Sequence, residues 1–374
     1  FIVNNFPNIS ILVKSCDIRC FSDKMYLENG IEVVDNLDDC DVLFGVKEVP
    51  LNALIPNKVY LYFSHIIKEQ IYNRDLLIRM IDLNIRMIDY EVIKDTNGKR
   101  LLGFGKFAGI VGAYNTFLTY GLKTGLYNLK SAYECYDQNE MEEQLNKIKL
   151  ENERIIVTGM GRVGKGIIEI IKKLDIKQVS VEQFLNNCFD EPVYVHLNTM
   201  DYNVRKDNQV IGKKDFYNNP HMYESSFMKY AKKADILIAG HYYSTGSPYL
   251  FTREDAKSSD FNLNVIGDIS CDINGPIAST IRSSTIESPI YGYNMETEKE
   301  DDFMKKNVLA VMAVDNLPCE LPKDSSRYFG NKIIEHVLPL LYHDKNLLLE
   351  KATICRDGDL TNNFEYLRDF INND

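Results

Sequence analysis

The stretch that decides the fold is Arg154-Ile-Ile-Val-Thr-Gly159-Met-Gly161-Arg162-Val-Gly164-Lys165-Gly166-Ile-Ile-Glu-Ile-Ile171. Its β-branched start is typical of a buried strand, and the isoleucines after the glycines have helical spacing. The G-x-G-x-x-G pattern at this junction has a physical reason at each position. Gly159 allows a tight turn, Gly161 lets a diphosphate approach the backbone, and Gly164 lets the helix pack closely. Unpaired N–H groups at the helix start attract an anion, which predicts dinucleotide binding, with a ligand-free βα turn as the alternative.

The acid that would hold the adenosine ribose is indistinct. In such folds the strand after the glycine helix ends in Asp or Glu about 20 residues on. The candidate strand, residues 176–181, ends at Ser180 and Val181, with Glu182 one residue later. Glu182 either reaches the ribose or begins the next helix, and both interpretations stay open. We therefore predict NAD or NADP, with a slight preference for NAD, and include Ser180 among the cofactor-binding residues.

Length and composition narrow the class of protein. A chain of 374 residues is long enough for two domains, and its 45% hydrophobic and 26% charged residues are ordinary for a globular protein. A net charge of −11 without a basic stripe argues against nucleic acid as a partner. The eight cysteines form no C-x-x-C pair, which predicts buried thiols in a reducing compartment and no metal site. With neither a signal peptide nor an 18-residue apolar run, we expect a cytoplasmic protein without a membrane span.

Polar side chains follow three successive strands in the first hundred residues. Short apolar runs alternate there with helical patterns, which predicts a parallel, wound sheet. Ligands of such sheets bind beyond the carboxyl ends of the strands. Lys47, His65 and Glu91 each lie at or just past such an end. We therefore expect these three side chains to converge on one cleft.

Each candidate side chain also has a purely structural interpretation. Lys47 would be a usable base in a cleft beside a cationic cofactor, or a surface lysine paired with Glu48. His65 suits proton transfer near neutral pH, or it is a satisfied histidine in a strand-end turn. Arg100 would clamp a carboxylate through two parallel hydrogen bonds, or it is an exposed loop charge.

Further candidates follow two strands of the second half. Residues 234–240 and 264–268 read as buried strands, which end at Gly240-His241 and at Asp268-Ile269. Asp268 would hold a ribose hydroxyl or the substrate amine, or it caps a helix or turn. Between the glycine stretch and these strands, residues 190–222 are rich in Asn and Tyr. We interpret them as a long irregular loop that covers the cofactor or a neighbouring subunit.

Two helical segments suggest how the domains are connected. Residues 107–126 are apolar and rich in small side chains, which predicts a closely packed helix that crosses between domains. A second helix, over 328–341, is expected to return to the first domain. We therefore predict a catalytic domain of residues 1–125 plus 308–374, interrupted by a dinucleotide-binding domain of residues 126–307.

Several motifs together resemble a known family. They are Asp41-Val-Leu-Phe-Gly-Val-Lys47-Glu48-Val-Pro50, Tyr62-Phe-Ser-His65, Asp89-Tyr-Glu91, Gly98-Lys-Arg100-Leu-Leu-Gly-Phe104, Gly267-Asp268-Ile-Ser-Cys-Asp272-Ile-Asn-Gly275 and Ala313-Val-Asp315-Asn-Leu-Pro-Cys-Glu320-Leu-Pro322. This combination is similar to the lysine-forming saccharopine dehydrogenases and the lysine–oxoglutarate reductases. The wider superfamily includes alanine dehydrogenase and the nicotinamide nucleotide transhydrogenase domain.

The resemblance implies a fold and a reaction. The fold would be α/β, with two Rossmann-like doubly wound domains and the active site in the cleft between them. Saccharopine would be oxidised by nicotinamide to an imine and hydrolysed to lysine and 2-oxoglutarate, or formed in the reverse direction. The long segment 190–222 looks more like that of the reductases and favours that direction.

The resemblance also assigns roles to residues. Lys47 would be the base for the substrate amine, His65 would activate water, and Glu91 would tune both. Substrate-binding positions would be Lys68, Gln70, Arg100 and Phe104, of which Arg100 takes a carboxylate. Cofactor contacts would come from the turn with Gly159, Gly161, Arg162 and Gly164, from Gly240 and His241, and from Asp268 and Ile269.

Two alternatives remain beside this prediction. One is an alanine dehydrogenase-like enzyme that uses a small 2-oxo acid and ammonia, although cations at Lys68, Lys99 and Arg100 favour a dicarboxylic adduct. The other is a non-catalytic dinucleotide-binding protein, favoured if the family's first strand and its substrate-binding arginine, which we do not find here, are absent from the protein. The expected partners are small amino-acid and oxo-acid substrates, and neither nucleic acid nor a membrane. A homo-oligomer is left open.

Overall fold

The computed structural model describes residues 2–6 and 8–372 and divides into two compact units. Unit 1 consists of Phe1–Gly103 and Ser326–Asp374, and unit 2 of Phe104–Ser325. Unit 2 is therefore inserted between two segments of unit 1. The predicted division placed residues 104–125 and 308–325 with the first domain, whereas here they belong to unit 2. The reason is the long helix α4 (Gly105–Thr124), which packs on the sheet of unit 2 rather than on that of unit 1.

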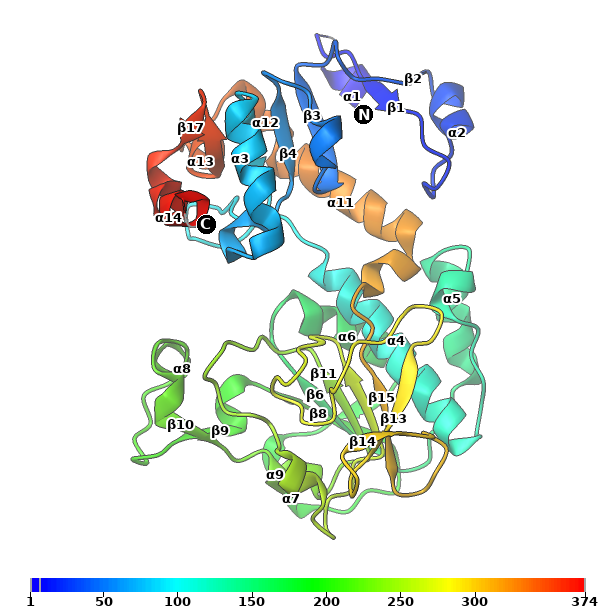
Figure 1. Cartoon of the computed structure of the whole chain (residues 1–374). Helices are drawn as coiled ribbons and strands as arrows, with labels where there is room; N and C mark the ends of the chain where they lie inside the picture. Colours follow the sequence, from blue (N-terminus) through cyan, green and yellow to red (C-terminus); the bar gives the residue numbers. More distant parts are fainter. Residues whose placement is uncertain (1, 7, 373–374) are drawn as a thin grey trace. The chain divides into compact units, whose positions relative to one another are not determined.

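Unit 1 is built on a five-stranded sheet in the order β17-β16-β5-β4-β3 (Figure 1). Its strands and the separate pair β1-β2 are β1 (Leu12–Lys14), β2 (Glu32–Val34), β3 (Val42–Lys47), β4 (Val59–Phe63), β5 (Arg86–Asp89), β16 (Thr353–Arg356) and β17 (Asp359–Leu360). β3, β4 and β5 are parallel, while β16 runs antiparallel to β5. The carboxyl ends of the three parallel strands therefore lie at one edge of the sheet, as the sequence predicted.

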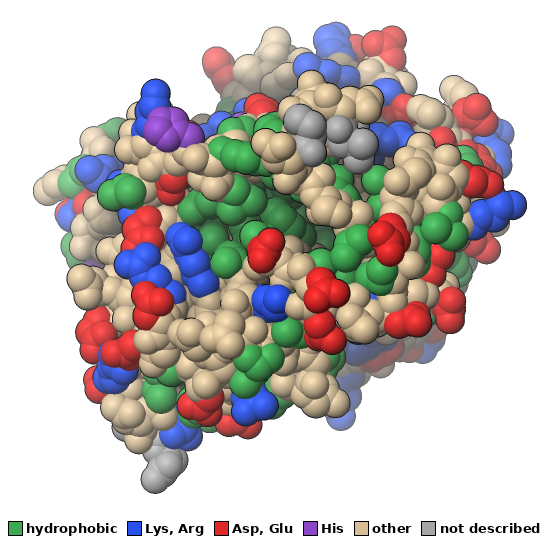
Figure 2. Space-filling view, turned by 90° about the horizontal axis from the view of Figure 1, so that it is seen from above, with side chains coloured by type: hydrophobic (Ala, Val, Ile, Leu, Met, Phe, Trp, Pro, Cys, Tyr) green, Lys and Arg blue, Asp and Glu red, His purple; other side chains and the backbone are tan. Residues whose placement is uncertain are grey.

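The helices of unit 1 are short apart from two. They are α1 (Ile2–Asn5), α2 (Asp23–Glu28), α3 (Arg74–Asp82), α11 (Pro322–His336), α12 (Leu338–Tyr342), α13 (Leu348–Lys351) and α14 (Arg368–Asn372). Residues 60–63 of β4 are buried, whereas β3 is the edge strand and leaves Phe44 and Val46 about half exposed. Figure 2 shows hydrophobic side chains gathered in a hollow on the face that it displays, bordered by charged and polar ones.

Unit 2 is built on an eight-stranded sheet in the order β14-β13-β15-β12-β11-β6-β8-β7. The strands are β6 (Arg154–Thr158), β7 (Lys177–Gln178), β8 (Val193–Leu197), β11 (Ile236–Ala239), β12 (Val265–Asp268), β13 (Ile290–Asn294), β14 (Lys299–Asp301) and β15 (Val308–Met312). All of them are parallel except β13 and β14. The glycine stretch follows β6, in the middle of the parallel part.

Helices cover both faces of this sheet. They are α4, α5 (Gln138–Gln144), α6 (Arg162–Lys173), α7 (Val181–Asn186), α8 (Lys213–Asn218), α9 (Met228–Ala231) and α10 (Arg253–Ala256). α4 and α6 meet backbone to backbone, because a Cβ atom on Gly109 would lie 2.0 Å from the carbonyl oxygen of Val163. The small residues of α4 therefore serve the close packing that the sequence predicted.

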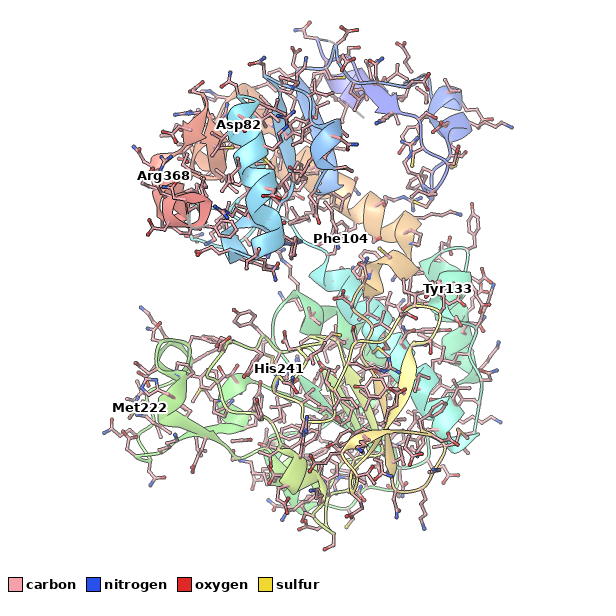
Figure 3. The ribbon with its side chains drawn as sticks, in the orientation of Figure 1. Asp82, Phe104, Tyr133, Met222, His241 and Arg368 are labelled. Carbon is pink, nitrogen blue, oxygen red and sulfur yellow. The ribbon has the colours of Figure 1, made fainter. Side chains whose placement is uncertain are left out.

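The segment 190–222 is not the irregular loop that we expected. It contains β8, which lies between β6 and the edge strand β7, and β9 (Asn203–Arg205), which pairs with β10 (Tyr223–Ser225). The run from Val193 to Leu197 has the β-branched and aromatic residues of a buried strand. The part with β9, α8 and β10, marked by Met222 in Figure 3, projects from the sheet of unit 2 (Figures 1 and 3).

Two predictions from bulk composition, on the cysteines and on membrane spans, can be compared with the structure. The eight cysteines form no disulfide within the described chain, but only Cys135 and Cys355 are buried, and Cys188 and Cys319 are exposed. The expectation of buried thiols therefore holds for two of them. Among residues 2–6 and 8–372, no helix combines the length and the hydrophobicity that crossing a bilayer requires.

Candidate functional site

A histidine and a glutamate meet at the carboxyl edge of the unit 1 sheet. His65 follows β4 in a left-handed backbone conformation (φ 56°), and Glu91 follows β5 by two residues. His65 Nδ1 lies 3.1 Å from Glu91 Oε2. An ionised carboxylate can only accept, so Nδ1 carries the proton of this hydrogen bond. Two of the three predicted catalytic residues are therefore in direct contact.

A buried carboxylate holds the two turns together. Asp89 has no exposed surface, and its Oδ2 accepts from Ser64 Oγ at 2.5 Å, while its Oδ1 accepts from the backbone N–H of Glu91 at 2.7 Å. Ser64 Oγ also accepts from the backbone N–H of Ile66 at 3.3 Å. Burial raises the pKa of Asp89. This brace, which our sequence reasoning missed, orders the residues on both sides of His65 and Glu91.

Positively charged side chains lie near Glu91 as well. Arg100 Nη1 lies 3.4 Å from Glu91 Oε1, and its guanidinium sits over the ring of Phe63, 5.4 Å from the centroid. The pKa of Glu91 is lowered, mainly by the His65 hydrogen bond and further by the charges of Lys68 and Arg100. Glu91 is therefore an ionised carboxylate between an imidazole and a guanidinium, a geometry suited to orienting a proton donor.

Two other predicted residues of unit 1, Lys47 and Gln70, are not part of this contact. Lys47 ends β3 beside Phe63 of β4, but its side chain is exposed and makes no hydrogen bond or ion pair with a described residue, Glu48 included. Gln70 is exposed and accepts from the hydroxyl of Tyr72 at 2.6 Å. Phe104 belongs to unit 2, where it precedes the first residue of α4 (Figure 3).

The glycine turn of unit 2 has two crowded positions and one open position. A Cβ atom on Gly159 (φ 94°) would lie 2.2 Å from the carbonyl oxygen of Gly240, and one on Gly164 would lie 1.8 Å from that of Gly159. A Cβ atom on Gly161 would have nothing within 4 Å. Gly161 directly precedes α6, which begins at Arg162. The open space at the start of a twelve-residue helix therefore fits an anionic group such as a diphosphate.

His241 lies just past the end of β11, the strand beside β6 (Figure 3). Its Nδ1 is 2.8 Å from Thr158 Oγ1, and its Nε2 has no partner among the described residues. Burial lowers the pKa of His241 to about 4, so the ring is neutral at neutral pH. A buried, unpaired ring nitrogen beside the glycine turn is a polar atom that a bound ligand could satisfy.

Two other predicted cofactor positions have structural tasks. Both carboxylate oxygens of Asp268 accept hydrogen bonds, Oδ1 from Ser270 and from the Cys271 backbone, and Oδ2 from Thr280 Oγ1 at 2.6 Å. Burial raises the pKa of this acid. Of the interpretations we left open for Asp268, turn capping is the one that these contacts match. Ile269 is buried, and its side chain packs against Gly112 of α4.

Ser180 is the N-cap residue of α7, two residues after the end of β7. Its hydroxyl accepts from the backbone N–H of Gln183 at 3.1 Å, and Gln183 Oε1 accepts from its N–H in return. Glu182 is exposed in the first turn of this helix. β8 separates both residues from β6.

His196, which the sequence analysis does not single out, contacts the glycine turn. It lies on β8, and its Nε2–H donates to the carbonyl oxygen of Gly159 at 2.8 Å. The signal that could have found it is the strand pattern from Val193 to Leu197, which places residue 196 level with Val157 of β6.

Comparisons with known proteins agree with this architecture. Residues 7–111 match a family model described as the N-terminal domain of alanine dehydrogenase/PNT, and residues 131–363 match the C-terminal domain of the same family. Two solved structures share the fold: an L-alanine dehydrogenase (TM-score 0.62, 15% identity, 94% of this chain and 88% of that one) and a transhydrogenase from Sinorhizobium meliloti (TM-score 0.56, 12% identity, 91% and 87%). The predicted class, α/β with Rossmann-like wound domains, is confirmed.

Sequence relatives extend the comparison. Alpha-aminoadipic semialdehyde synthase, mitochondrial, from Bos taurus is 27% identical over 96% of this chain and 44% of its own length. The Arabidopsis thaliana protein named alpha-aminoadipic semialdehyde synthase is 28% identical over 96% and 38%. Saccharopine dehydrogenase (NAD(+), L-lysine-forming) from Yarrowia lipolytica is 22% identical over 89% and 85%. This chain thus spans less than half the length of the first two relatives.

The contacts of Glu91 predict a pH effect. Its ordinary pKa is 4.5 and the folded value is lower, so its contribution to stability is present above pH 4.5 and is lost as the pH falls through the folded pKa. His65→Phe removes the largest cause, so the Glu91 pKa should rise and the unfolding free energy should fall less steeply between about pH 5 and 3. Carboxyl NMR titration and urea unfolding measure both. Lys94→Gln, an exposed change in the same loop, is the control, and an unchanged Glu91 pKa in His65→Phe would contradict the assignment.

Proposed function

Since this chain belongs to the alanine dehydrogenase/PNT family, we propose that it is a nicotinamide-dependent oxidoreductase that interconverts saccharopine with lysine and 2-oxoglutarate. The observation that carries this proposal is the contact of His65 with Glu91 at the carboxyl edge of a parallel sheet, with Arg100 beside it. Relatives whose names specify saccharopine dehydrogenase and alpha-aminoadipic semialdehyde synthase support the choice of substrate.

The reaction requires acid–base groups and anion anchors. A hydride leaves the carbon beside the secondary amine of saccharopine for the nicotinamide, water adds to the resulting imine, and the carbinolamine splits into lysine and 2-oxoglutarate. His65, with Glu91 orienting its ring, would take the proton of the attacking water and return it to the leaving amine. Arg100 and Lys68 would bind substrate carboxylates. Lys47 would accept the proton of the substrate amine, from the neighbouring strand end.

The same proposal assigns the dinucleotide to unit 2. The open position at Gly161 and the first N–H groups of α6 would hold the diphosphate, with Arg162 at the first helical residue. The unpaired Nε2 of His241 would take a polar group of the ligand. The cofactor is NAD or NADP in this proposal, with NAD slightly preferred. Unit 1 would then be the substrate-binding unit.

The proposal also covers the location and the assembly of the protein. We propose a cytoplasmic enzyme of small amino-acid and oxo-acid substrates that can form a homo-oligomer. The mammalian relatives carry "mitochondrial" in their names, so fractionation of cells that express the full-length protein is the appropriate test.

Substrate assays separate the proposal from its rivals. We expect the protein to oxidise NADH or NADPH with lysine plus 2-oxoglutarate, and not with pyruvate plus ammonia. Turnover with the second pair would favour an alanine dehydrogenase-like enzyme. Tight binding of a dinucleotide without turnover of either pair would favour a non-catalytic binding protein. Loss of cofactor absorbance, with saccharopine identified by mass spectrometry, is the measurement.

Two substitutions test the assigned acid–base groups. Lys47→Met and His65→Gln should each lower kcat by about 100-fold or more, the range typical of losing a general acid or base. The dissociation constant for the dinucleotide, measured by fluorescence, should stay near that of the wild type, because both residues belong to unit 1. Lys94→Gln provides the matched control. Unchanged turnover in both variants would rule out the proposed roles.

The glycine turn allows binding and folding to be tested apart. Gly161→Ala places a methyl group in open space, so we expect at least about tenfold weaker dinucleotide binding and an unfolding free energy within about 1 kcal/mol of the wild type. Gly164→Ala places it against the Gly159 carbonyl and should cost about 2 kcal/mol or more of stability. Calorimetric titration and urea unfolding give the two quantities. Full affinity in Gly161→Ala would argue against a diphosphate at this turn.

A further inference from the structure

The strand beside the glycine strand is not the next strand in the sequence. In the ordinary dinucleotide fold, the strand that follows the glycine helix lies directly beside the glycine strand, and its end holds the adenosine ribose. Here the following strand, β7, pairs with β8, and it is β8 that pairs with β6. Neighbouring strands are about 4.8 Å apart, so the end of β7 lies about 10 Å from that of β6. β8 thus occupies the ribose position.

Contacts at the carboxyl end of β8 support this position. Leu197 lies level with Thr158, the last residue of β6, so the residues after Leu197 lie beside the glycine turn. The hydrogen bond from His196 Nε2 to the Gly159 carbonyl ties the two segments together. A single turn of 3-10 helix, Thr199–Asp201, follows immediately.

Asp201, the last residue of this turn, uses one of its two carboxylate oxygens to close the turn in a capping box with Asn198. Its Oδ2 accepts from the backbone N–H of Asn198 at 2.8 Å and from Asn198 Nδ2 at 2.6 Å. Its carbonyl oxygen accepts from the hydroxyl of Tyr230 at 2.9 Å, which fixes the backbone. Oδ1 makes no hydrogen bond with any described residue, and the side chain is only partly buried. One carboxylate oxygen is therefore anchored while the other remains able to accept.

On these grounds, and resting on the proposed dinucleotide function, we propose that Asp201 accepts the adenosine ribose hydroxyls and makes the protein select NADH over NADPH. An ionised carboxylate accepts from a 2′-hydroxyl but repels a 2′-phosphate, so one residue supplies both attraction and exclusion. The cations that follow along β9 already have partners: Arg205 pairs with Asp207 and Asp215, and Lys206 Nζ bonds the His221 carbonyl.

Equilibrium titration of the full chain with NADH and with NADPH, in the absence of substrate, tests the inference. Fluorescence or calorimetry gives a dissociation constant for each. The wild type should bind NADH at least about tenfold more tightly. Asp201→Asn removes the charge and should narrow this ratio severalfold, mainly by tightening NADPH. Asp201→Glu keeps the charge and should retain the preference, which separates a charge effect from damage to the fold.

A matched variant just after β7 tests whether the ribose is instead held by the acid that follows this strand. Glu182→Gln removes the acid of the strand that follows the glycine helix and should change neither affinity. A loss of NADH preference in Glu182→Gln would overturn the inference, as would equal effects of Asp201→Asn on both dinucleotides. Tighter binding of NADPH by the wild type, abolished in Arg162→Gln, would also overturn it, yet leave dinucleotide binding intact. Binding of neither dinucleotide would remove the proposed function itself.

Discussion

Backbone atoms approach one another around α6 more closely than any side chain would allow, and unit 2 depends on this approach. Gly164 meets the carbonyl of Gly159, Gly166 meets that of Lys106, and Gly109 of α4 meets that of Val163. These contacts leave no freedom in where α6 starts relative to β6. Gly161, directly before the start of α6, has open space around it. A binding site for an anion is thus a consequence of packing that the fold requires in any case.

In unit 1, hydrogen bonds rather than closely packed glycines fix the positions of the site residues. Two turns that are far apart in the sequence must present His65 and Glu91 to each other. Parallel pairing of β4 with β5 brings the turns to one edge, and the buried carboxylate of Asp89 bonds to both. Because a buried carboxylate without partners is costly, any shift of either turn would be opposed by the loss of these bonds. The pairing of β4 with β5 and the hydrogen bonds of Asp89 therefore hold His65 and Glu91 in contact.

Much of this arrangement was accessible from the sequence, because the relevant signals are local. The glycine turn, the parallel strands of both units and the positions of His65 and Glu91 at or just past strand ends all follow from short patterns of residues. The strand order of unit 2 does not. β8 was hidden in a segment rich in Asn and Tyr, and nothing in a strand's own sequence states which neighbour it will pair with. The boundary of the units was missed for a related reason, since the apolar pattern of α4 does not reveal which sheet buries it.

The roles of individual carboxylates were equally inaccessible, although each one lies at or shortly after the end of an apolar strand. What distinguishes them is how much hydrogen-bonding capacity the fold has already used. Asp268 is buried with both oxygens occupied, and Asp89 likewise, so each orders a turn. Asp201 keeps one oxygen unused at a partly buried position, which leaves it capable of binding something else. Sequence gives the position of an acid, but its remaining capacity depends on partners that only the folded chain brings to it.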